Sequence, residues 1–251
     1  ADEVSAANIT LTGGDITTQK KVTAGNDLTL TATNGKLTAE VLQAQGSIAA
    51  AGKDVEMKQQ VIAGKDLTMT AANSLTTADK LTAGGNIAAS TATGNMDIAA
   101  AEATGGIDLK AANGKLTAEA LQAKENIAAA GKDVAMKQAT AGNNLTMTAA
   151  NSLTTADKLT AANITLTAVN NLTTEAELLA DQKLTLTGGD VTTHKKVTAG
   201  NDMTLTGTNS LTTADEVSAA NITLTGGDVT TQKKVNAGSN LTMTAANKLT
   251  T

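Results

Sequence analysis

The chain contains no cysteine, proline, tryptophan, tyrosine or phenylalanine among its 251 residues. The lack of cysteine excludes disulfides, and one histidine is too few for the usual zinc sites. Aromatic side chains are normally the largest groups in a globular core, so their absence argues against an ordinary globular domain. No stretch approaches about 18 consecutive apolar residues, which argues against a transmembrane helix.

The sequence also offers little for catalysis or for binding nucleic acid. His194 takes the place that Gln19 and Gln232 hold in sister segments, and no nucleophile or orienting group accompanies it, so we expect a surface corner residue. A net charge of −5 and the lack of aromatic rings argue against a nucleic-acid partner. We therefore expect no enzyme, no cofactor, no metal and no insertion into a membrane.

What the sequence does contain is a repeat. A phrase such as Val22–Thr31, with Leu37 following it, returns several times with small changes. Its middle segment opens on an apolar residue every 18 to 20 residues, at Ile9, Leu28, Ile48, Leu67, Ile87, Ile107, Ile127, Leu145, Ile164, Leu184, Met203, Ile222 and Leu241. Short periods of this kind indicate stacked structural repeats.

Each repeat contains three short segments of strand-forming residues separated by Gly, Asn and Asp. Apolar residues alternate with Thr, so one face of each segment points inward, as predicted for Val22, Ala24, Leu28, Leu30, Leu37 and Ala39. Glycine and Asn suit corners because they tolerate positive φ or bond their own backbone. A narrow core of aliphatic residues has no room for rings, and proline would remove a donor from a central strand.

The predicted fold is therefore all-β: a right-handed parallel β-helix, or β-solenoid, of about 13 coils of roughly 19–20 residues, with three short strands in each coil. We expect one continuous solenoid over residues 1–251, uncapped at both ends and a segment of a longer repeat array. The competing hypothesis is a local helix at 37–51 and 116–130, which are rich in helix formers. Both stretches keep the coil spacing and end at Gly52 and Gly131, which favours strands.

Two kinds of polar residue need partners in this fold. Some inward positions are threonine, such as Thr18, Thr77 and Thr155, and we expect their hydroxyls to bond neighbouring threonines or the backbone. Asparagines recur at corners, and we expect stacked amides at Asn73, Asn113, Asn151, Asn209 and Asn247.

The phrases at 24–31, 63–70 and 141–148, all of the form Ala-Gly-x-x-Leu-Thr-x-Thr, resemble the repeats of filamentous haemagglutinin-type exoproteins. The resemblance covers nearly the whole chain. It implies a right-handed parallel β-helix in a bacterial protein exported by two-partner secretion. It also implies a secreted or cell-surface location and use as an adhesin stalk or fibre. The secretion-signal domain and a tip domain of that family are not recognisable here.

The most regular surface feature is an outward Thr-x-Thr row, uninterrupted in the second half of the chain. It comprises Thr146, Thr148, Thr165, Thr167, Thr185, Thr187, Thr204, Thr206, Thr223, Thr225, Thr242 and Thr244. Such a grid resembles the ice-binding face of insect-type antifreeze proteins, but threonine is also simply a good outward strand residue. Earlier coils interrupt the row at Ala49 and Ala51, Ala88 and Ser90, Asp97 and Ala99, Asp108 and Lys110, and Ala128 and Ala130.

Two further patterns have simpler explanations. The Gly-Gly-Asp runs at 13–15, 188–190 and 226–228 resemble incomplete calcium-binding repeats, but corner geometry explains them better. The lysine pairs at 20–21, 195–196 and 233–234 suit solvated corners better than an acidic partner.

The function that we predict is a structural or adhesive extracellular fibre segment, with ice binding as the alternative. The expected partners are neighbouring copies or flanking repeats, through exposed strand edges at the coil ends, and a host or cell-surface receptor.

Overall fold

The computed structural model describes residues 3–251, and every regular element in that range is a β-strand. The chain divides into two compact units, Ala1–Gly131 and Lys132–Thr251, here called the first and the second unit. Each unit is a parallel β-solenoid, and together they hold about 13 turns. The all-β parallel fold predicted from the sequence is confirmed, whereas the continuity of 1–251 as one domain stays a prediction.

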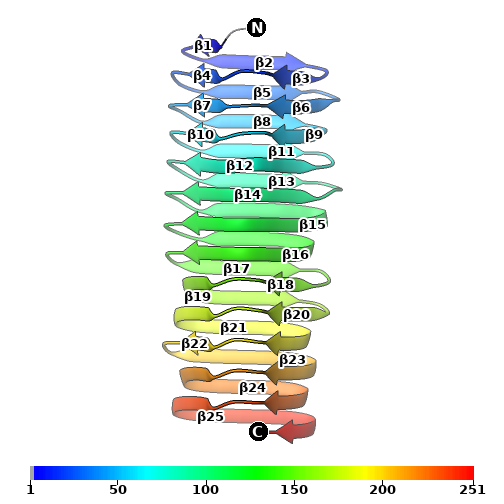
Figure 1. Cartoon of the computed structure of the whole chain (residues 1–251), viewed down its shortest axis with the longest axis vertical. Helices are drawn as coiled ribbons and strands as arrows, with labels where there is room; N and C mark the ends of the chain where they lie inside the picture. The colour runs from blue at the N-terminus through cyan, green and yellow to red at the C-terminus, as the bar shows by residue number, and fades with distance from the viewer. Residues whose placement is uncertain (1–2) are drawn as a thin grey trace. The chain divides into compact units, whose positions relative to one another are not determined.

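In the first unit the chain repeats a short strand, a middle strand and a third strand (Figure 1). The strands are β1 (Val4–Ala6), β2 (Ile9–Gly13), β3 (Ile16–Thr18), β4 (Val22–Ala24), β5 (Leu28–Ala32), β6 (Lys36–Ala39), β7 (Leu42–Ala44), β8 (Ile48–Gly52), β9 (Asp54–Met57), β10 (Val61–Ala63), β11 (Leu67–Ala71), β12 (Leu75–Ala83), β13 (Ile87–Thr91), β14 (Met96–Ala103) and β15 (Ile107–Ala123).

The same order continues in the second unit after β16, whose residues Ile127–Ala141 include the unit boundary. Its strands are β17 (Asn144–Ala149), β18 (Leu153–Thr155), β19 (Leu159–Ala168), β20 (Asn171–Thr174), β21 (Leu178–Thr193), β22 (Val197–Ala199), β23 (Asp202–Thr213), β24 (Val217–Thr231) and β25 (Val235–Thr250). Several of these strands, such as β21 and β25, run through a corner without a break. The prediction of three separate short strands in every coil is therefore too strict.

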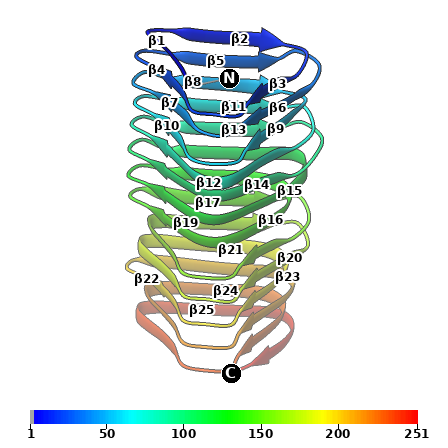
Figure 2. The same cartoon turned by 45° about the horizontal axis from the view of Figure 1, so that its top comes forward.

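Each coil pairs in parallel with the next, and the register follows the apolar residues that open the middle segments. In the first unit Ile9 lies opposite Leu28, and Leu28 opposite Ile48. In the second unit Leu145 lies opposite Ile164, and Ile164 opposite Leu184. In Figure 2, β2, β5, β8 and β11 of the first unit accordingly lie side by side. The predicted coil spacing is confirmed.

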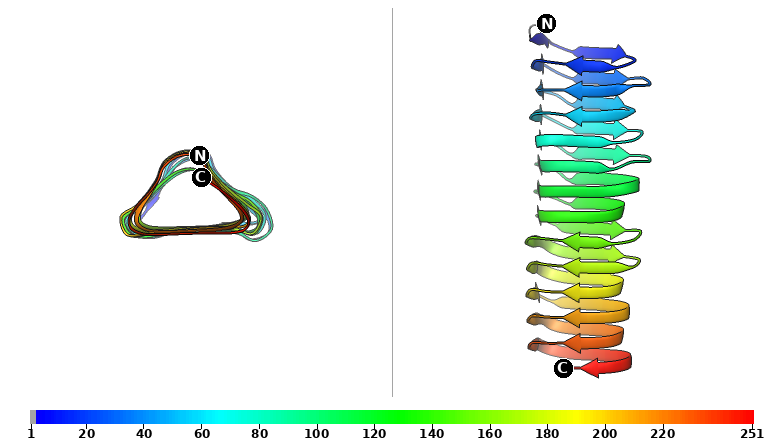
Figure 3. Two further views of the ribbon diagram at one scale, coloured as in Figure 1. Left: turned by 90° about the horizontal axis from the view of Figure 1, so that it is seen from below. Right: turned by 45° about the vertical axis from the view of Figure 1, so that its right-hand side comes forward.

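The core of each unit is the interior of the coil, which winds around a triangular outline (Figure 3). The six predicted inward side chains, Val22, Ala24, Leu28, Leu30, Leu37 and Ala39, are all at most 1% exposed. The two stretches with helical propensity are strands instead: 37–51 forms β6, β7 and β8, and 116–130 lies in β15 and β16. Burial of alternate side chains outweighs the local helix preference there.

The corners use glycine for a different reason from the one expected. No residue in 3–251 has a positive φ, so the expected left-handed conformation is wrong. Instead, successive coils approach closely at these positions. A Cβ on Gly64 would lie 2.1 Å from the carbonyl oxygen of Gln45, and one on Gly84 would lie 2.2 Å from that of Gly64. Glycine is needed there because a side chain would push the coils apart.

Candidate functional site

The outward threonines of the second unit form a grid of two columns. In one column Thr146 lies opposite Thr165, which lies opposite Thr185, and the column continues through Thr204, Thr223 and Thr242. The other column contains Thr148, Thr167, Thr187, Thr206, Thr225 and Thr244 in the same register. The twelve residues singled out from the sequence are therefore brought together on one face of the second unit.

This threonine grid is positioned by the alternation along β17, β19, β21, β23, β24 and β25. In β19, for example, Ile164 and Leu166 are buried while Thr165 and Thr167 are half-buried. Rungs of a parallel sheet repeat at about 4.8 Å, so the grid presents rows of methyl and hydroxyl groups at that spacing. It contains no group that titrates near neutral pH. The side chains of the grid therefore offer hydroxyl and methyl groups but no acid–base pair.

The first unit has the same row with interruptions. Thr29 and Thr31 lie opposite Ala49 and Ala51 of the next coil. Further along, the row has Ala88 and Ser90, and then Asp108 and Lys110. The assignment of Asp97 and Ala99 to this row is wrong. Asp97 pairs with Thr76 and Thr117, which lie on the third strands of their coils and not on the middle strands that carry the row.

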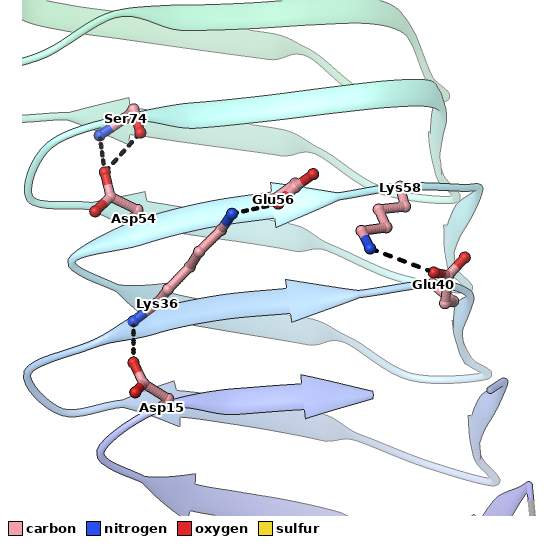
Figure 4. A network of polar contacts seen from close by, with 7 residues as sticks. All are labelled: Asp15, Lys36, Glu40, Asp54, Glu56, Lys58 and Ser74. Atoms are coloured by element: carbon pink, nitrogen blue, oxygen red, sulfur yellow. Dashed lines mark hydrogen bonds and ion pairs between the residues drawn. The ribbon is translucent and has the colours of Figure 1, made fainter. Parts of the chain in front are cut away.

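Charged residues of the first unit connect successive coils at its corners (Figure 4). The carboxylate of Asp15 accepts a 2.7 Å hydrogen bond from the backbone N–H of Lys36, and the ammonium of Lys36 lies 2.5 Å from Glu56. That contact with Lys36 holds the pKa of Glu56 below its usual value. Each charge thus bridges one coil to the next on the solvent side of the sheet.

Asp54 shows the same arrangement with a hydroxyl partner. Its Oδ1 accepts hydrogen bonds from the Ser74 side chain at 2.6 Å and from the Ser74 backbone N–H at 3.1 Å. The Ser74 hydroxyl is the main reason why the pKa of Asp54 lies below its usual value. In the second unit Asp190 likewise accepts a 2.6 Å bond from the Ser210 hydroxyl. Two of the three aspartates of the Gly-Gly-Asp runs, Asp15 and Asp190, therefore serve as acceptors for the following coil.

Stacked amides also connect the coils of the second unit. Asn151 donates to Asp133 at 2.6 Å and accepts from Asn170 at 2.7 Å, so the ladder expected at Asn151 is present. At two other expected positions the partners are not amides: Asn113 donates to the carbonyl oxygen of Ala92 at 2.8 Å, and Asn73 accepts from the Thr93 hydroxyl at 3.2 Å. Sequence reasoning missed a second ladder, in which Asn221 donates to Asp202 at 3.0 Å and Asn240 donates to Asn221 at 2.9 Å. A signal for it exists in the sequence. Each of these residues directly precedes the apolar residue that opens a middle strand.

The remaining candidates from the sequence are the single histidine and the clusters of acidic residues. The side chain of His194 is 45% exposed, and its Nε2 lies 3.7 Å from the carboxylate of Glu175 on the preceding coil. Within residues 3–251 no three His, Asp or Glu side chains gather as metal ligands would. A shallow groove of about 520 Å³ follows one corner of the first unit, where small residues such as Ala51, Gly52 and Ala71 line it.

No helix in residues 3–251 is long and apolar enough to cross a membrane. A family model described as haemagglutinin repeat matches residues 1–56, 59–100, 140–207 and 170–251, which together cover well over half of the chain. No curated protein and no solved structure matches the chain. The matched ranges include every strand of the threonine grid.

Proposed function

Because the chain belongs to the haemagglutinin repeat family, we propose that it is a stalk segment of a bacterial adhesive exoprotein, displayed at the cell surface or released. Members of the family are exported by two-partner secretion and act outside the cell as structural and adhesive proteins. The observation that carries the proposal is the family match over two units in which successive coils pair in parallel, with apolar residues opposite one another.

The side chains support a structural role. Polar groups at the corners bond the next coil, as Asp15 does with Lys36 and Asn221 with Asp202, so they hold the stack together. The coils repeat every 18 to 20 residues, which leaves little chain for the long loops that would build a substrate cleft. A stalk needs only length and stability, and both come from repeating one coil. We therefore propose no enzymatic activity.

The ice-binding alternative gains no support from the family match. The threonine grid has a sufficient explanation in strand geometry, because threonine packs well on the outward face of a pleated sheet.

Export can be tested directly because the chain has no cysteine, so one introduced thiol is unique. The chain would be fused behind a two-partner secretion-signal domain and expressed in a bacterium with the matching transporter. Thr165→Cys lies on the half-buried outward face, and Thr174→Cys replaces a residue that is 0% exposed. Intact cells or medium would then be treated with a maleimide that does not cross membranes.

We expect labelling of the Thr165→Cys fusion only when the transporter is present, and protection of Thr174→Cys until the protein is unfolded. Labelling of Thr165→Cys together with protection of Thr174→Cys would show that the exported chain has folded into the solenoid. If the signal domain alone reached the surface while the fusion stayed inside the cell, the proposal would be wrong.

A further inference from the structure

The threonine grid of the second unit has a border column that contains two adjacent, opposite charges. The border column consists of the residues that precede the apolar opening of each middle segment, and its members pair in register: Asn144, Asn163, Lys183, Asp202, Asn221 and Asn240. Lys183 pairs directly with Asp202 of the next coil. Both side chains are exposed, and neither forms an ion pair with any residue that the structure describes. One positive and one negative charge therefore stand side by side on a face of hydroxyl, methyl and amide groups.

The other border of the grid, here called the corner border, alternates side chains with glycines. It lies two residues after the second threonine column and consists of Ala150, Val169, Gly189, Thr208, Gly227 and Ala246. A Cβ on Gly189 would lie 3.1 Å from the carbonyl oxygen of Val169, so these corners are stacked like the strands beside them. Val169 is 66% exposed, more than any other large apolar side chain of residues 3–251. A surface that packs against the grid must therefore offer a hollow for this valine.

The border column fits a second copy of itself. A two-fold axis that runs parallel to the strands, between the two faces, makes the coil axes of two copies antiparallel. Each border then faces the same border of the other copy, as a self-complementary two-fold interface requires. With this axis placed between the coils of Lys183 and Asp202, each lysine faces an aspartate of the other copy. The asparagines on either side of the charges face asparagines, so the border column is complementary throughout.

The corner border gives the same register independently. The same axis makes Val169 of one copy face Gly227 of the other, and Thr208 face Gly189. Each of these two side chains thus faces a position that has none, which supplies the hollow that the valine needs. Between the two borders, threonines face threonines. Charge at one border and shape at the other therefore agree on one arrangement.

The second possible two-fold arrangement, with parallel coil axes, lacks this agreement. Its axis runs along the coils, so the border column of one copy faces the corner border of the other. Lys183 would then face Gly189, and Asp202 would face Thr208, so neither charge would meet a partner. Only the antiparallel arrangement pairs both charges.

The face is large enough for a reversible contact. Six coils spaced by about 4.8 Å and seven residues spaced by about 3.3 Å give a face of about 500 Å² per copy. Two such faces would bury about 1,000 Å² together, near the lower limit for a specific interface. A contact of this size opens readily, so the thiol of Thr165→Cys in the export experiment stays accessible to the maleimide.

We propose that the threonine grid binds the threonine grid of a second copy of this chain, with antiparallel coil axes and Lys183 of each copy facing Asp202 of the other. The proposal goes beyond the stalk function, because it adds a lateral contact between stalk segments. It does not depend on that function. A chain that is exported normally but stays monomeric would overturn the lateral contact and leave the stalk function standing.

Two charge-reversal variants test the contact by mixing. Lys183→Asp leaves only acidic side chains at the two charged positions, and Asp202→Lys leaves only basic ones. Either variant alone sets like charges face to face, whereas a mixture pairs every aspartate with a lysine. In sedimentation velocity at low salt, we expect the parent chain to dimerise and each variant alone to have a dissociation constant raised by about tenfold or more. The mixture should recover dimerisation, which no effect inside a single chain can produce.

Lys158→Asp is the matched control for the mixing experiment. It makes the same change of charge at an exposed lysine of the second unit that lies outside the grid, and it should dimerise like the parent chain. A parent chain that is monomeric at every soluble concentration would overturn the proposal. So would equal dimerisation of Lys183→Asp and Lys158→Asp, or charge-reversal variants that stay monomeric after mixing.

Cross-linking reads out the direction of the two coil axes. The chain has no cysteine, so Thr165→Cys and Thr223→Cys each carry a single thiol. In the proposed contact these two thiols face each other across sheets about 10 Å apart, whereas two copies of one variant hold theirs three rungs, about 14 Å, out of line. With a mass tag on one variant, a short bismaleimide should join the two variants to each other and neither variant to itself. Self-cross-linking without a mixed product would overturn the antiparallel arrangement.

Discussion

The two units fill the interior of a coil in different ways. Each coil of the second unit has a large inward side chain late in its middle segment and an inward threonine at the end of its third segment, such as Leu186 and Thr193. The first unit varies the pair: Leu30 accompanies Ala39, but Ala50 accompanies Met57. The later coils of the first unit continue the variation, with Met69 and Thr77, Ala89 and Ile98, and Leu109 and Ala118. In every coil one member is large and the other small.

This comparison indicates that the summed volume of the two side chains stays similar from coil to coil, whereas the position that holds the larger one changes. Protein interiors are close-packed, so a large residue on one side of the narrow triangle must be matched by a small one on the other. We infer that Met57 fills the space left by alanine at position 50, and that the threonines inside the second unit match the large residues of the same coil in the same way. Threonine is therefore selected there for its volume rather than its hydroxyl.

The largest effect on stability is expected for Leu186→Ala in the second unit, which tests whether the two interior positions of a coil share one volume. Thr193 stays small in this variant, so the coil would contain a cavity, and we expect a loss of about 2–5 kcal/mol in the free energy of unfolding. Thr193→Met alone should overpack the same coil and cost about 1–3 kcal/mol. Unfolding in urea would be followed by circular dichroism, because the chain has no aromatic residue to report by fluorescence.

The double variant Leu186→Ala with Thr193→Met recreates the pair Ala50 and Met57 in a coil whose third strand also has the same valine, Val191 in place of Val55. We expect it to be more stable than either single variant, with a coupling energy of about 0.5–3 kcal/mol. If the loss in the double variant equalled the sum of the losses in the two single variants, the two positions would not share one volume. The proposed difference in packing between the units would then be wrong.

The fold was predictable from the sequence because the repeat makes the register visible. One inward leucine or isoleucine every 18 to 20 residues fixes which strands pair, and Ile9, Leu28 and Ile48 lie opposite one another as expected. The threonine grid follows from that register alone. The polar details were less predictable because they depend on neighbouring coils. Glycine at a corner signals a turn in the sequence, but the close approach of Gly84 to Gly64 appears only once the coils are stacked.

The buried hydroxyls are the clearest case of what the sequence could not settle. Thr18 and Thr155 were expected to bond neighbours, yet their Oγ1 atoms have no hydrogen-bond partner among the described residues. The same is true of Thr174, Thr193 and Thr213. Thr77 of the first unit does have a partner, since its Oγ1 accepts the backbone N–H of Ala99 at 3.2 Å. Threonines with and without a partner occupy the same position in the sequence repeat. The difference arises from the next coil, which supplies the partner.

Replacing these hydroxyls by methyl groups should separate the two kinds of buried threonine. Thr193→Val removes a buried polar atom that has no partner, and we expect the free energy of unfolding to rise by about 1 kcal/mol. Thr77→Val leaves the N–H of Ala99 without its acceptor, and we expect a loss of about 1 kcal/mol. Both changes nearly conserve volume, so each variant is the control of the other. Urea unfolding that moves both midpoints in the same direction would contradict the assignment.

The smallest effect that we predict is the pH dependence of one corner of the first unit. The Ser74 hydroxyl lowers the pKa of Asp54 in the first unit, from an ordinary value of 3.8. A group whose pKa is lower in the folded state than in the unfolded state stabilises the fold above its unfolded pKa. That contribution disappears as the pH falls through the folded pKa. Because the side chain is only half-buried and solvent screens its charge, we expect no more than about 0.5 kcal/mol from this carboxylate.

Asp54→Asn keeps an acceptor for Ser74 but removes the charge, so it should lose this small contribution at neutral pH and show no loss from this site on acidification. Asp97→Asn, an exposed aspartate of the same unit, removes an equal charge and is the matched control. The measurement is the free energy of urea unfolding at neutral pH and at a pH well below 3.8, compared between the two variants and the parent chain. Suppose that Asp54→Asn and Asp97→Asn lost the same free energy of unfolding on acidification. The hydrogen bond from Ser74 to Asp54 would then make no contribution to the pH dependence of stability.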